Sequence, residues 1–544
     1  MVRNLRLAIA WAVPLGFVAV LLLWPSLQLL MQAGSSGATV GPSLLAKAPA
    51  AIWFTIWQAL VSTGLSMLLG IPTALLLYRR RFFGSRLLRA FMLVPLVLPS
   101  IIVAVVFSAF QNWNTFYSIF GIQGSQIAWV ITAHVFVNFA LTARIVGSSW
   151  AALDVETEEA AALDGAGRFK TLVSVVLPQL RGALLASGTL TFLFTVTSYG
   201  IVLTLGGGSI ESIETLMAKS ALQFLDLGTA SVLALVQSAI TLAAVVIGGK
   251  VAAAQSQIES ADLSEPTKRL DRRDWAAVIF VVPTVIFFVL LPLLNLFFKA
   301  LTQPDDSFGL GNFAALAGRG NRNLLNISVF EAIANSMRNL GISTVIAVAL
   351  GLLAVYLRTR WTTRPKLGRA GWLWDFWILL PLGVSPVVIA LGWLVTFNQE
   401  PFALRASWLA IPLIQALLAL PLVVRVIQPS IQNLDASIVE ASILDGVGPL
   451  GSFLRVQLPA IRPVVASAVG FAAIASLGEY GAAAMLTFGD QATLPTVLYQ
   501  LISRPGSSNY GMAMAASCLL VMLTVAVVLL TATRMKPSAA SDAK

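Results

Sequence analysis

The sequence predicts an all-α polytopic membrane protein with about twelve transmembrane helices in two parallel six-helix repeats. Composition is the first reason. Of the 544 residues, 58% are hydrophobic and only 11% are charged, which is too little charge to cover the surface of a soluble protein. Apolar runs long enough to cross a lipid bilayer recur along the chain. In addition, one polar motif occurs twice, about half a chain length apart.

The apolar runs fall into two sets of six, and we expect each run to be a membrane-spanning helix. The first set covers residues 7–31, 53–78, 88–110, 126–148, 182–204 and 229–252. The second set covers residues 274–299, 331–357, 371–396, 406–428, 463–486 and 511–534. We therefore expect a first repeat at residues 1–252 and a second at 274–534. A polar linker at 253–273 and a polar tail at 535–544 complete the chain.

Charged residues predict how the chain is oriented. Arginines cluster at residues 79–89 and 358–369, and the linker and the tail are also basic. Basic loops remain on the cytoplasmic side of a membrane, so we expect both termini and the linker in the cytoplasm. The loop at 111–125 has no charge and is expected outside. Because each half has an even number of spans, the two repeats point the same way and are parallel.

Several functions are excluded by composition. The formal net charge of +11 lies mostly in the topology-setting clusters, so we do not expect nucleic-acid binding. With one cysteine and one histidine, no metal site built from several of these residues is expected. Gly248-Gly249-Lys250 lacks the spacing of a phosphate-binding loop, so the chain is not expected to hydrolyse ATP. No catalytic constellation is present, and we do not expect an enzyme.

The repeated motif is the most informative feature of the chain. Its glutamates are 281 residues apart, and the same shift relates the residues around them. The motif residues are Glu159, Ala160, Ala161, Asp164, Gly165, Gly167 and Pro178 in the first copy, and Glu440, Ala441, Asp445, Gly446, Gly448 and Pro459 in the second, where Ser442 replaces the second alanine. Both copies follow the fourth span of their half. They are therefore expected on the same, cytoplasmic, side of the membrane.

Elementary helix chemistry predicts the shape of each copy. Asp154 and Asp435 are suitable N-caps for a short helix of small residues. Gly165 and its counterpart end that helix because glycine tolerates a positive φ. A second amphipathic helix follows, and we expect Pro178 and Pro459 to stop it and to redirect the chain into the next span. The product is a helix–turn–helix at the cytoplasmic face. An alternative is an amphipathic helix that only rests on the membrane surface.

The pattern of Glu-Ala-Ala, glycine six residues on and Leu-Pro at positions eighteen and nineteen resembles the coupling motif of ABC importer permeases. This resemblance implies that each copy docks in a cleft of a cytoplasmic ABC ATPase subunit, so that two ATPase copies bind beneath the chain. ATP and Mg²⁺ would then be bound by those subunits, and no cofactor by this chain. It also implies an extracytoplasmic substrate-binding protein as a partner, and a location in the bacterial cytoplasmic (inner) membrane, surrounded by lipid.

Arg144 and Arg425 lie at the end of the span before each motif. Our hypothesis is that each arginine pairs with a motif carboxylate and anchors the coupling helix to the bundle. The alternative is that both are ordinary positive-inside anchors.

Polar groups inside the membrane are costly and therefore suggest function. Glu479 and Tyr480 in the eleventh span correspond to Ser198 and Tyr199 in the fifth. We predict that these four residues line the translocation path and that the negative charge suits a cationic solute. The alternative is that Glu479 is paired within the bundle and the tyrosines only pack. His134, one helical turn from an asparagine, is interpreted as part of an interhelical hydrogen bond.

Further segments resemble the thiamine and ferric-iron permease families. They are 205–208, 213–215 and 234–237 in the first half, and 476–481, 493–495 and 498–500 in the second. Parts of the second set also resemble sulfate, molybdate and polyamine permeases. The resemblance implies import of a small solute, thiamine or ferric iron. The alternative from another class is a proton-coupled secondary transporter with Glu479 as the proton carrier. Transport into proteoliposomes separates the two, because the importer needs ATP and the ATPase whereas the carrier needs only a gradient.

Overall fold

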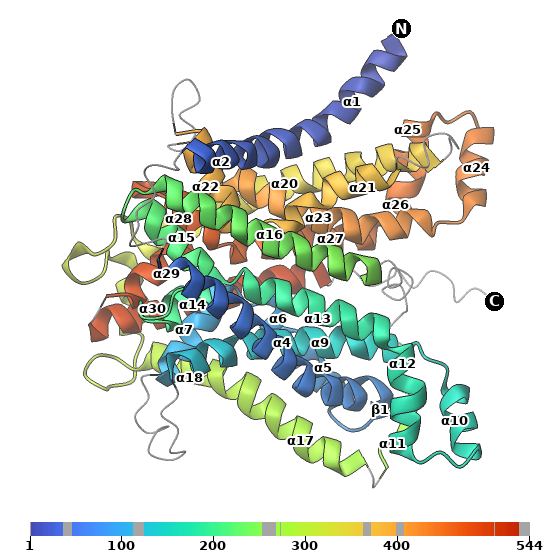
Figure 1. Ribbon diagram of the computed structural model, residues 1–544, viewed down its shortest axis with the longest axis horizontal. Helices are drawn as coiled ribbons and strands as arrows, with labels where there is room; N and C mark the ends of the chain where they lie inside the picture. The colour runs from blue at the N-terminus through green and yellow to red at the C-terminus, as the bar shows by residue number, and fades with distance from the viewer. Residues whose placement is uncertain are drawn as a thin grey trace.

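The computed structural model describes residues 2–35, 46–111, 125–252, 268–271, 274–362, 371–398, 407–504 and 506–532, and nearly all of them are helical (Figure 1). The long and inner helices of the first half are α1 (Val2–Val18), η1 (Ala19–Leu23), α2 (Trp24–Ser35), α4 (Ala48–Arg79), α5 (Ser85–Phe91), α6 (Val94–Val97), α7 (Ser100–Gln111), α9 (Gln126–Ala151), α13 (Arg181–Val196), α14 (Tyr199–Leu205), α15 (Ile213–Leu222) and α16 (Leu227–Ala252).

The second half repeats this order. Its long and inner helices are α17 (Trp275–Val285), η5 (Ile286–Leu290), α18 (Leu291–Leu301), α20 (Val329–Thr362), α21 (Gly371–Leu379), η9 (Leu380–Gly383), α22 (Pro386–Thr396), α23 (Ala410–Gln432), α27 (Arg462–Gly478), α28 (Gly481–Leu486), α29 (Leu494–Ile502) and α30 (Ser507–Ala532). Short connecting elements are α19 (Gly311–Ala314), η6 (Ala315–Ala317), η7 (Asn321–Asn323) and η12 (Gly489–Gln491).

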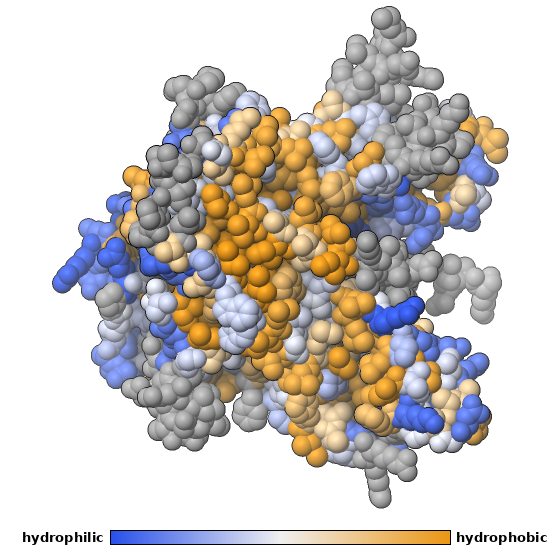
Figure 2. Space-filling model, viewed as in Figure 1, coloured by the Kyte–Doolittle hydropathy of each residue, from blue (hydrophilic) through white to orange (hydrophobic). Residues whose placement is uncertain are grey.

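The described helices have the lengths and composition of a polytopic membrane protein. Eight of them are long and apolar enough to cross a membrane, and four bent helix pairs raise the number to twelve if each pair is one span. Figure 2 shows apolar residues across the middle of the molecule and polar residues toward its two ends. The predicted fold class is therefore confirmed.

The third predicted span of each half, 88–110 and 371–396, is not one straight helix. The chain turns by 103° between α6 and α7 and by 93° between η9 and α22. Leu98 and Ser385 stand directly before a proline, which pushes the preceding residue from helical into extended backbone; their ψ angles are 127° and 142°. As a result, α7 and α22 lie inside the bundle, where most of their side chains are buried.

The fifth predicted span of each half is also interrupted. In the first half, α13 ends at Val196 and α14 begins at Tyr199; in the second, α27 ends at Gly478 and α28 begins at Gly481. The residues predicted to line the path therefore lie in or beside these breaks rather than within a continuous helix.

The two halves exchange their first helices. Trp377 and Trp393 of the second half donate indole hydrogen bonds to the carbonyl oxygens of Leu15 and Leu21 in the first helix of the chain, at 3.2 and 2.9 Å. In the opposite direction, Phe288 of η5 packs against aromatic side chains of α7 and α9, with ring centroids 5.7 to 6.3 Å apart. Each repeat is thus continuous in sequence, but its first span covers the other repeat.

The predicted linker at 253–273 lies outside the described residues except at 268–271, and the predicted tail at 535–544 lies entirely outside them. Strand β2 (Lys268–Arg269) pairs in parallel with β1 (Arg80–Arg81), which directly follows α4. Arg80 also forms an ion pair with Asp274 at 2.7 Å. The end of the connection between the halves is therefore attached beside the basic end of α4.

Candidate functional site

Both copies of the repeated motif fold into a helical hairpin on the same side of the molecule. The first consists of α10 (Val155–Leu163), α11 (Arg168–Thr171), η3 (Leu172–Val176) and α12 (Leu177–Gln179). The second consists of α24 (Ala436–Leu444), α25 (Pro449–Ser452), η11 (Phe453–Gln457) and α26 (Leu458–Ala460). In Figure 1, α10 and α24 project from the bundle at the right, at the end that carries β1.

The predicted caps are present in both hairpins. Asp154 accepts a hydrogen bond from the N–H of Glu156 at 3.0 Å, and Asp435 accepts one from the N–H of Ser437 at 2.9 Å. The N–H of Ser437 lowers the pKa of the Asp435 carboxyl, since this bond favours its charged form. Each helix thus begins with a charged acceptor at its positive end.

A left-handed glycine ends each of these helices. Gly165 has φ +79° and Gly446 has φ +74°. In the first hairpin, the N–H of Ala166 donates to the carbonyl oxygen of Ala161 at 3.0 Å, and the second hairpin repeats this bond between Val447 and Ser442. This is the Schellman arrangement, which satisfies the last carbonyl groups of a helix. The break predicted from the glycines is therefore present in both copies.

The motif residues present an exposed surface. Glu159, Ala160, Asp164 and their counterparts in the second copy, Glu440, Ala441 and Asp445, are exposed, as are Gly167 and Gly448. Sequence reasoning missed the two leucines at the tips, Leu163 and Leu444, whose side chains are 89% and 88% exposed. An apolar side chain held at a rigid tip is suited to a partner protein. Their equivalence under the 281-residue shift was the available signal.

The prediction that Pro178 and Pro459 stop the second helix of the hairpin and redirect the chain into the next span holds to within one residue. The helix continues for one residue past each proline, and the chain then bends by 70° in the first half and 82° in the second. A turn of π-helix, η3 or η11, directly precedes the proline-containing turn. This wider turn gives room for the ring and reduces the clash that a proline causes inside an α-helix.

Arg144 does not anchor the first hairpin. It is exposed on α9, and the described residues offer it no ion pair with a motif carboxylate. That role belongs to Arg79, the last residue of α4, which pairs with Glu158 and donates to the carbonyl oxygen of Leu153 at 3.3 Å. Arg79 is only 7% exposed. The hypothesis placed the anchoring arginine on α9, but it is on α4, whose last residue bonds to Leu153 just after the end of α9.

The second hairpin is held differently. Arg425 is exposed on α23, and position 439, which corresponds to Glu158, is a valine. Within this hairpin, Ser442 and Ser452 share a hydrogen bond of 2.7 Å that joins its two arms. The ring of Phe453 packs on Tyr356 of α20 with centroids 5.1 Å apart. The two motifs are therefore similar at their exposed tips and different at their attachments.

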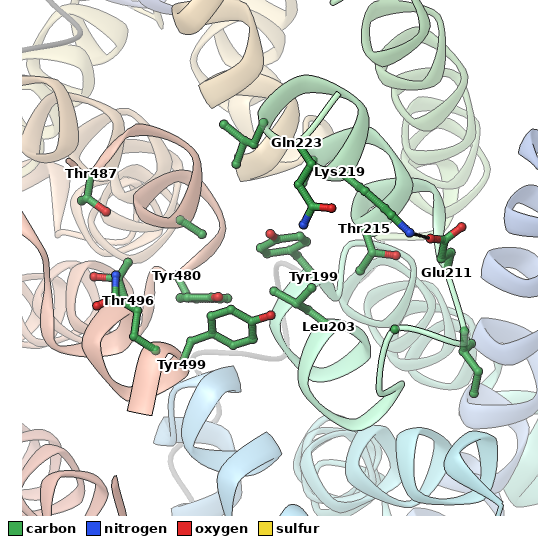
Figure 3. A pocket seen from close by; sticks show the side chains of 16 residues that line it. Tyr199, Leu203, Glu211, Thr215, Lys219, Gln223, Tyr480, Thr487, Thr496 and Tyr499 are labelled. Carbon is green, nitrogen blue, oxygen red and sulfur yellow. Dashed lines mark hydrogen bonds and ion pairs between the residues drawn. The ribbon is translucent and has the colours of Figure 1, made fainter. Parts of the chain in front are cut away.

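A cavity of about 490 Å³ lies between the two halves, at the end of the bundle opposite the hairpins. Figure 3 shows α14 and α15 on one side of it and α28 and α29 on the other. Its lining residues are Tyr199, Leu203, Gly208, Ile210, Glu211, Thr215, Ala218, Lys219, Leu222, Gln223, Tyr480, Ala484, Thr487, Thr496, Tyr499 and Gln500. Four residues were predicted to line the translocation path. Tyr199 and Tyr480 line this cavity, whereas Ser198 and Glu479 do not.

Matching hydrogen bonds position the two sides of the cavity. Ser212 caps the start of α15 in a capping box with Thr215, and Thr493 caps the start of α29 in a capping box with Thr496. Thr55 of α4 accepts a hydrogen bond from the first N–H of α15 at 3.0 Å, and Ser336 of α20 does the same for α29 at 2.9 Å. The long helices α4 and α20 therefore hold corresponding walls of the cavity.

Glu479 does not face the cavity, which favours the alternative that it is paired within the bundle. Its carboxylate accepts hydrogen bonds from the N–H groups of Ala482 at 2.6 Å and Ala483 at 3.2 Å. Both amides belong to the first turn of α28, which would otherwise leave them unsatisfied. The hydroxyl of Ser198 lies 2.7 Å from Nε2 of His134. Both predicted path residues are therefore hydrogen-bonded within the bundle.

Two other sets of buried polar groups connect separate elements of the bundle. Asn138 donates to the carbonyl oxygen of His134 at 2.8 Å and lies 3.5 Å from Thr195 on α13, so this pair does join two helices. Glu214, which lies between the fifth and sixth predicted spans, is fully buried in α15 and accepts a hydrogen bond from Ser385 of the other half. Its neighbours in sequence gave no sign of burial.

Comparison with known proteins agrees with this geometry. The pattern of the family described as "Binding-protein-dependent transport system inner membrane component" matches residues 66–257 and 361–535, one match in each half. The thiamine transport system permease protein ThiP of Brucella abortus (strain 2308) is 26% identical over 541 residues, which cover 96% of this chain and 94% of that protein. ThiP of Escherichia coli (strain K12) is 27% identical over 476 residues, 82% of each chain. This chain belongs to the binding-protein-dependent inner membrane components, as a fused, multi-pass permease of an ABC importer.

Proposed function

We propose that this chain is the permease of a thiamine importer. Two copies of a cytoplasmic ATPase dock on the two hairpins and bind the ATP and Mg²⁺. An extracytoplasmic binding protein delivers the solute to the opposite face, where the cavity lies. In this proposal both termini are in the cytoplasm.

The paired hairpins are the observation that carries this proposal. They lie on one side of the molecule and present matching capped helices and matching exposed leucines. A lipid-resting helix requires neither a left-handed glycine nor a second copy. A rigid tip that enters a partner requires a fixed shape, which the two Schellman turns supply. Two equivalent tips call for two equivalent partners.

The first attachment gives a route from the hairpin to the cavity. Arg79 binds α10 at one end of α4, and Thr55 binds α15 near the other end. A movement of the hairpin therefore acts on α4 as a whole, and α4 acts on the wall of the cavity. ATP-driven closure of the ATPases would rock the two halves between outward-open and inward-open states.

The choice of thiamine is supported by the relatives that span the chain and by the lining of the cavity. The lining has three tyrosines and a single carboxylate, Glu211, which Lys219 holds at 2.5 Å. Ferric iron, the other solute that the sequence suggests, is bound by several hard oxygen ligands. Glu211 is the one carboxylate among the described lining residues, and its ion pair with Lys219 leaves no free carboxylate for such an ion. A planar organic cation fits the tyrosines better.

Reconstitution tests the proposal. The chain is placed in liposomes with its ATPase inside, and uptake of labelled thiamine is measured with the binding protein outside. Uptake that requires ATP supports the proposal, and equal uptake driven by a proton gradient alone would replace it with the secondary transporter. Uptake of ferric iron but not thiamine under the same conditions would support the importer function and contradict the assignment of thiamine as its solute.

A further inference from the structure

We propose that the cavity between the halves is a solute-binding site within the permease itself, built for a small organic solute with a planar ring. This inference rests on the proposed function, to which it adds a location and a mode of recognition. The cavity has about 490 Å³, which lies within the range of roughly 300–1,000 Å³ typical of small-molecule sites.

The aromatic wall is the first argument. Tyr480 stacks on Tyr199 and also meets Tyr499, with centroids 5.9 Å apart and planes at 47°. Tyr199 and Tyr480 are 7% and 3% exposed, whereas Tyr499 is only half-buried. Figure 3 shows the three rings grouped together between the two sides of the cavity. Tyr499 therefore has a ring surface available to a solute, backed by the other two tyrosines, and such surfaces favour flat π systems.

Hydrogen-bonding groups face the same space. Gln223 and Gln500 line the cavity, and within the described part of the chain neither side-chain amide has a hydrogen-bond partner. A primary amide offers one acceptor and two donors, which suits the edge of a nitrogen heterocycle. Apolar side chains of Leu203 and Leu222 complete the lining. A mainly apolar pocket with a few free polar groups is the usual composition of a small-molecule site.

The charged residues of the lining offer no free carboxylate to a metal ion. Glu211 is shared by Lys219 at 2.5 Å and Lys47 at 3.9 Å, so its carboxylate is already neutralised. A positive charge spread over a ring can instead be stabilised by the tyrosine faces, without a dedicated carboxylate. The site therefore selects for ring shape first and charge second.

The repeats have diverged at this wall, as a binding site requires. Tyr499 and Gln500 correspond to Ala218 and Lys219 under the 281-residue shift, and all four line the cavity. A purely structural seam between two repeats has no need for different side chains at these two pairs of equivalent positions. The asymmetry gives the cavity one orientation in which an asymmetric solute fits.

The test is binding to the permease alone, without ATPase or binding protein. The chain is reconstituted in lipid nanodiscs, and labelled thiamine is measured by equilibrium dialysis. Competition is measured with the neutral aminopyrimidine half of thiamine and with choline, which has charge but no ring. We expect saturable binding, competition by the aminopyrimidine and at least tenfold weaker competition by choline. Equal competition by choline, or no saturable binding, would overturn the proposal.

Tyrosine variants locate the site. Tyr499→Leu should weaken thiamine binding roughly five- to tenfold, because one stacking ring is lost. Tyr499→Phe keeps the ring and should retain at least half of the affinity. Tyr510→Leu, a tyrosine of α30 outside the cavity, is the matched control and should bind as the wild type does. Unchanged binding in a folded Tyr499→Leu protein would place the site elsewhere.

This outcome is separable from the proposed function. ATP-driven thiamine uptake by a chain that binds no thiamine in nanodiscs would reject the site and retain the thiamine importer. Ring-selective binding without ATP-driven uptake of thiamine would retain the site and reject the assigned solute.

Discussion

Tyr199 and Tyr480 occupy equivalent positions in the two repeats, and their rings stack with centroids 5.6 Å apart and planes 21° apart. Tyr199 is the first residue of α14, and Tyr480 directly precedes α28. The stack therefore joins the two halves beside the cavity (Figure 3). Any movement that separates the halves here has to part these rings.

Gly200 is required by this stack. A Cβ at this position would lie 3.0 Å from Cδ1 of Tyr480, closer than ordinary contact. We expect Gly200→Ala to displace the ring and lower the free energy of unfolding by about 1–2 kcal/mol, as overpacking does. Thermal unfolding in detergent measures this. Gly182→Ala on α13, where nothing lies within 4 Å, is the control and should not be destabilised. Equal stability of both variants would show that the Tyr480 ring can move aside without cost and that the stack does not require Gly200.

Glu479 is predicted to be a structural cap rather than a contact for the solute. Glu479→Gln keeps an oxygen acceptor for the first turn of α28, so we expect transport to remain within about threefold of wild type. Glu479→Leu leaves two buried N–H groups without an acceptor and should cost about 1–3 kcal/mol of stability for each group. Uptake and thermal unfolding are measured for both variants. Loss of transport in a stable Glu479→Gln protein would instead indicate that the charge acts on the solute.

The hairpin glycines separate backbone strain from packing. Gly165 and Gly446 have positive φ, with open space around their Cα atoms. Replacement of either by alanine costs about 1–2 kcal/mol through the backbone alone, so we expect weaker ATPase binding. Gly448→Ala is the matched control, because Gly448 has an ordinary φ of −63° and nothing within 4 Å of an added Cβ. ATPase retention on the purified chain is the measurement. Equal retention in all three variants would contradict a rigid hairpin.

Arg79 is predicted to couple the first ATPase to the bundle. Glu158→Gln leaves the buried guanidinium without its charged partner, which we expect to weaken the attachment of α10 by roughly 1–3 kcal/mol. ATP hydrolysis should continue while thiamine uptake per ATP falls several-fold. Glu156→Gln, an exposed residue on the same helix, is the control. Unchanged uptake per ATP in Glu158→Gln would mean that this ion pair transmits nothing.

The repeat and the hairpins were predictable from the sequence because they depend on local rules. N-caps, left-handed glycines and apolar runs act over a few residues, so Asp154, Gly165 and the long spans could be read directly. The equivalence of the halves followed from one constant shift, which required no knowledge of the tertiary fold.

The remainder depends on contacts between distant segments. Arg144 and Arg79 both end a span near the motif, and only the packing of α4 decides that Arg79 meets Glu158. Glu479 has the composition of a path residue, but the break before α28 turns its carboxylate onto backbone amides. Burial of Glu214 depends on Ser385, which lies 171 residues away. A lone sequence contains no record of such pairings.

ATP-dependent thiamine uptake by the double variant Gly165→Ala plus Gly446→Ala, compared with Gly167→Ala plus Gly448→Ala, tests the central claim most directly. Both proteins are reconstituted with the same ATPase and binding protein, and both bound ATPase and uptake are recorded. The account predicts that the first variant loses bound ATPase and uptake together, and that the second, which changes no left-handed glycine, retains most of both. Full uptake in the first variant with ATPase still bound would contradict the claim that these two hairpins couple ATP hydrolysis to transport.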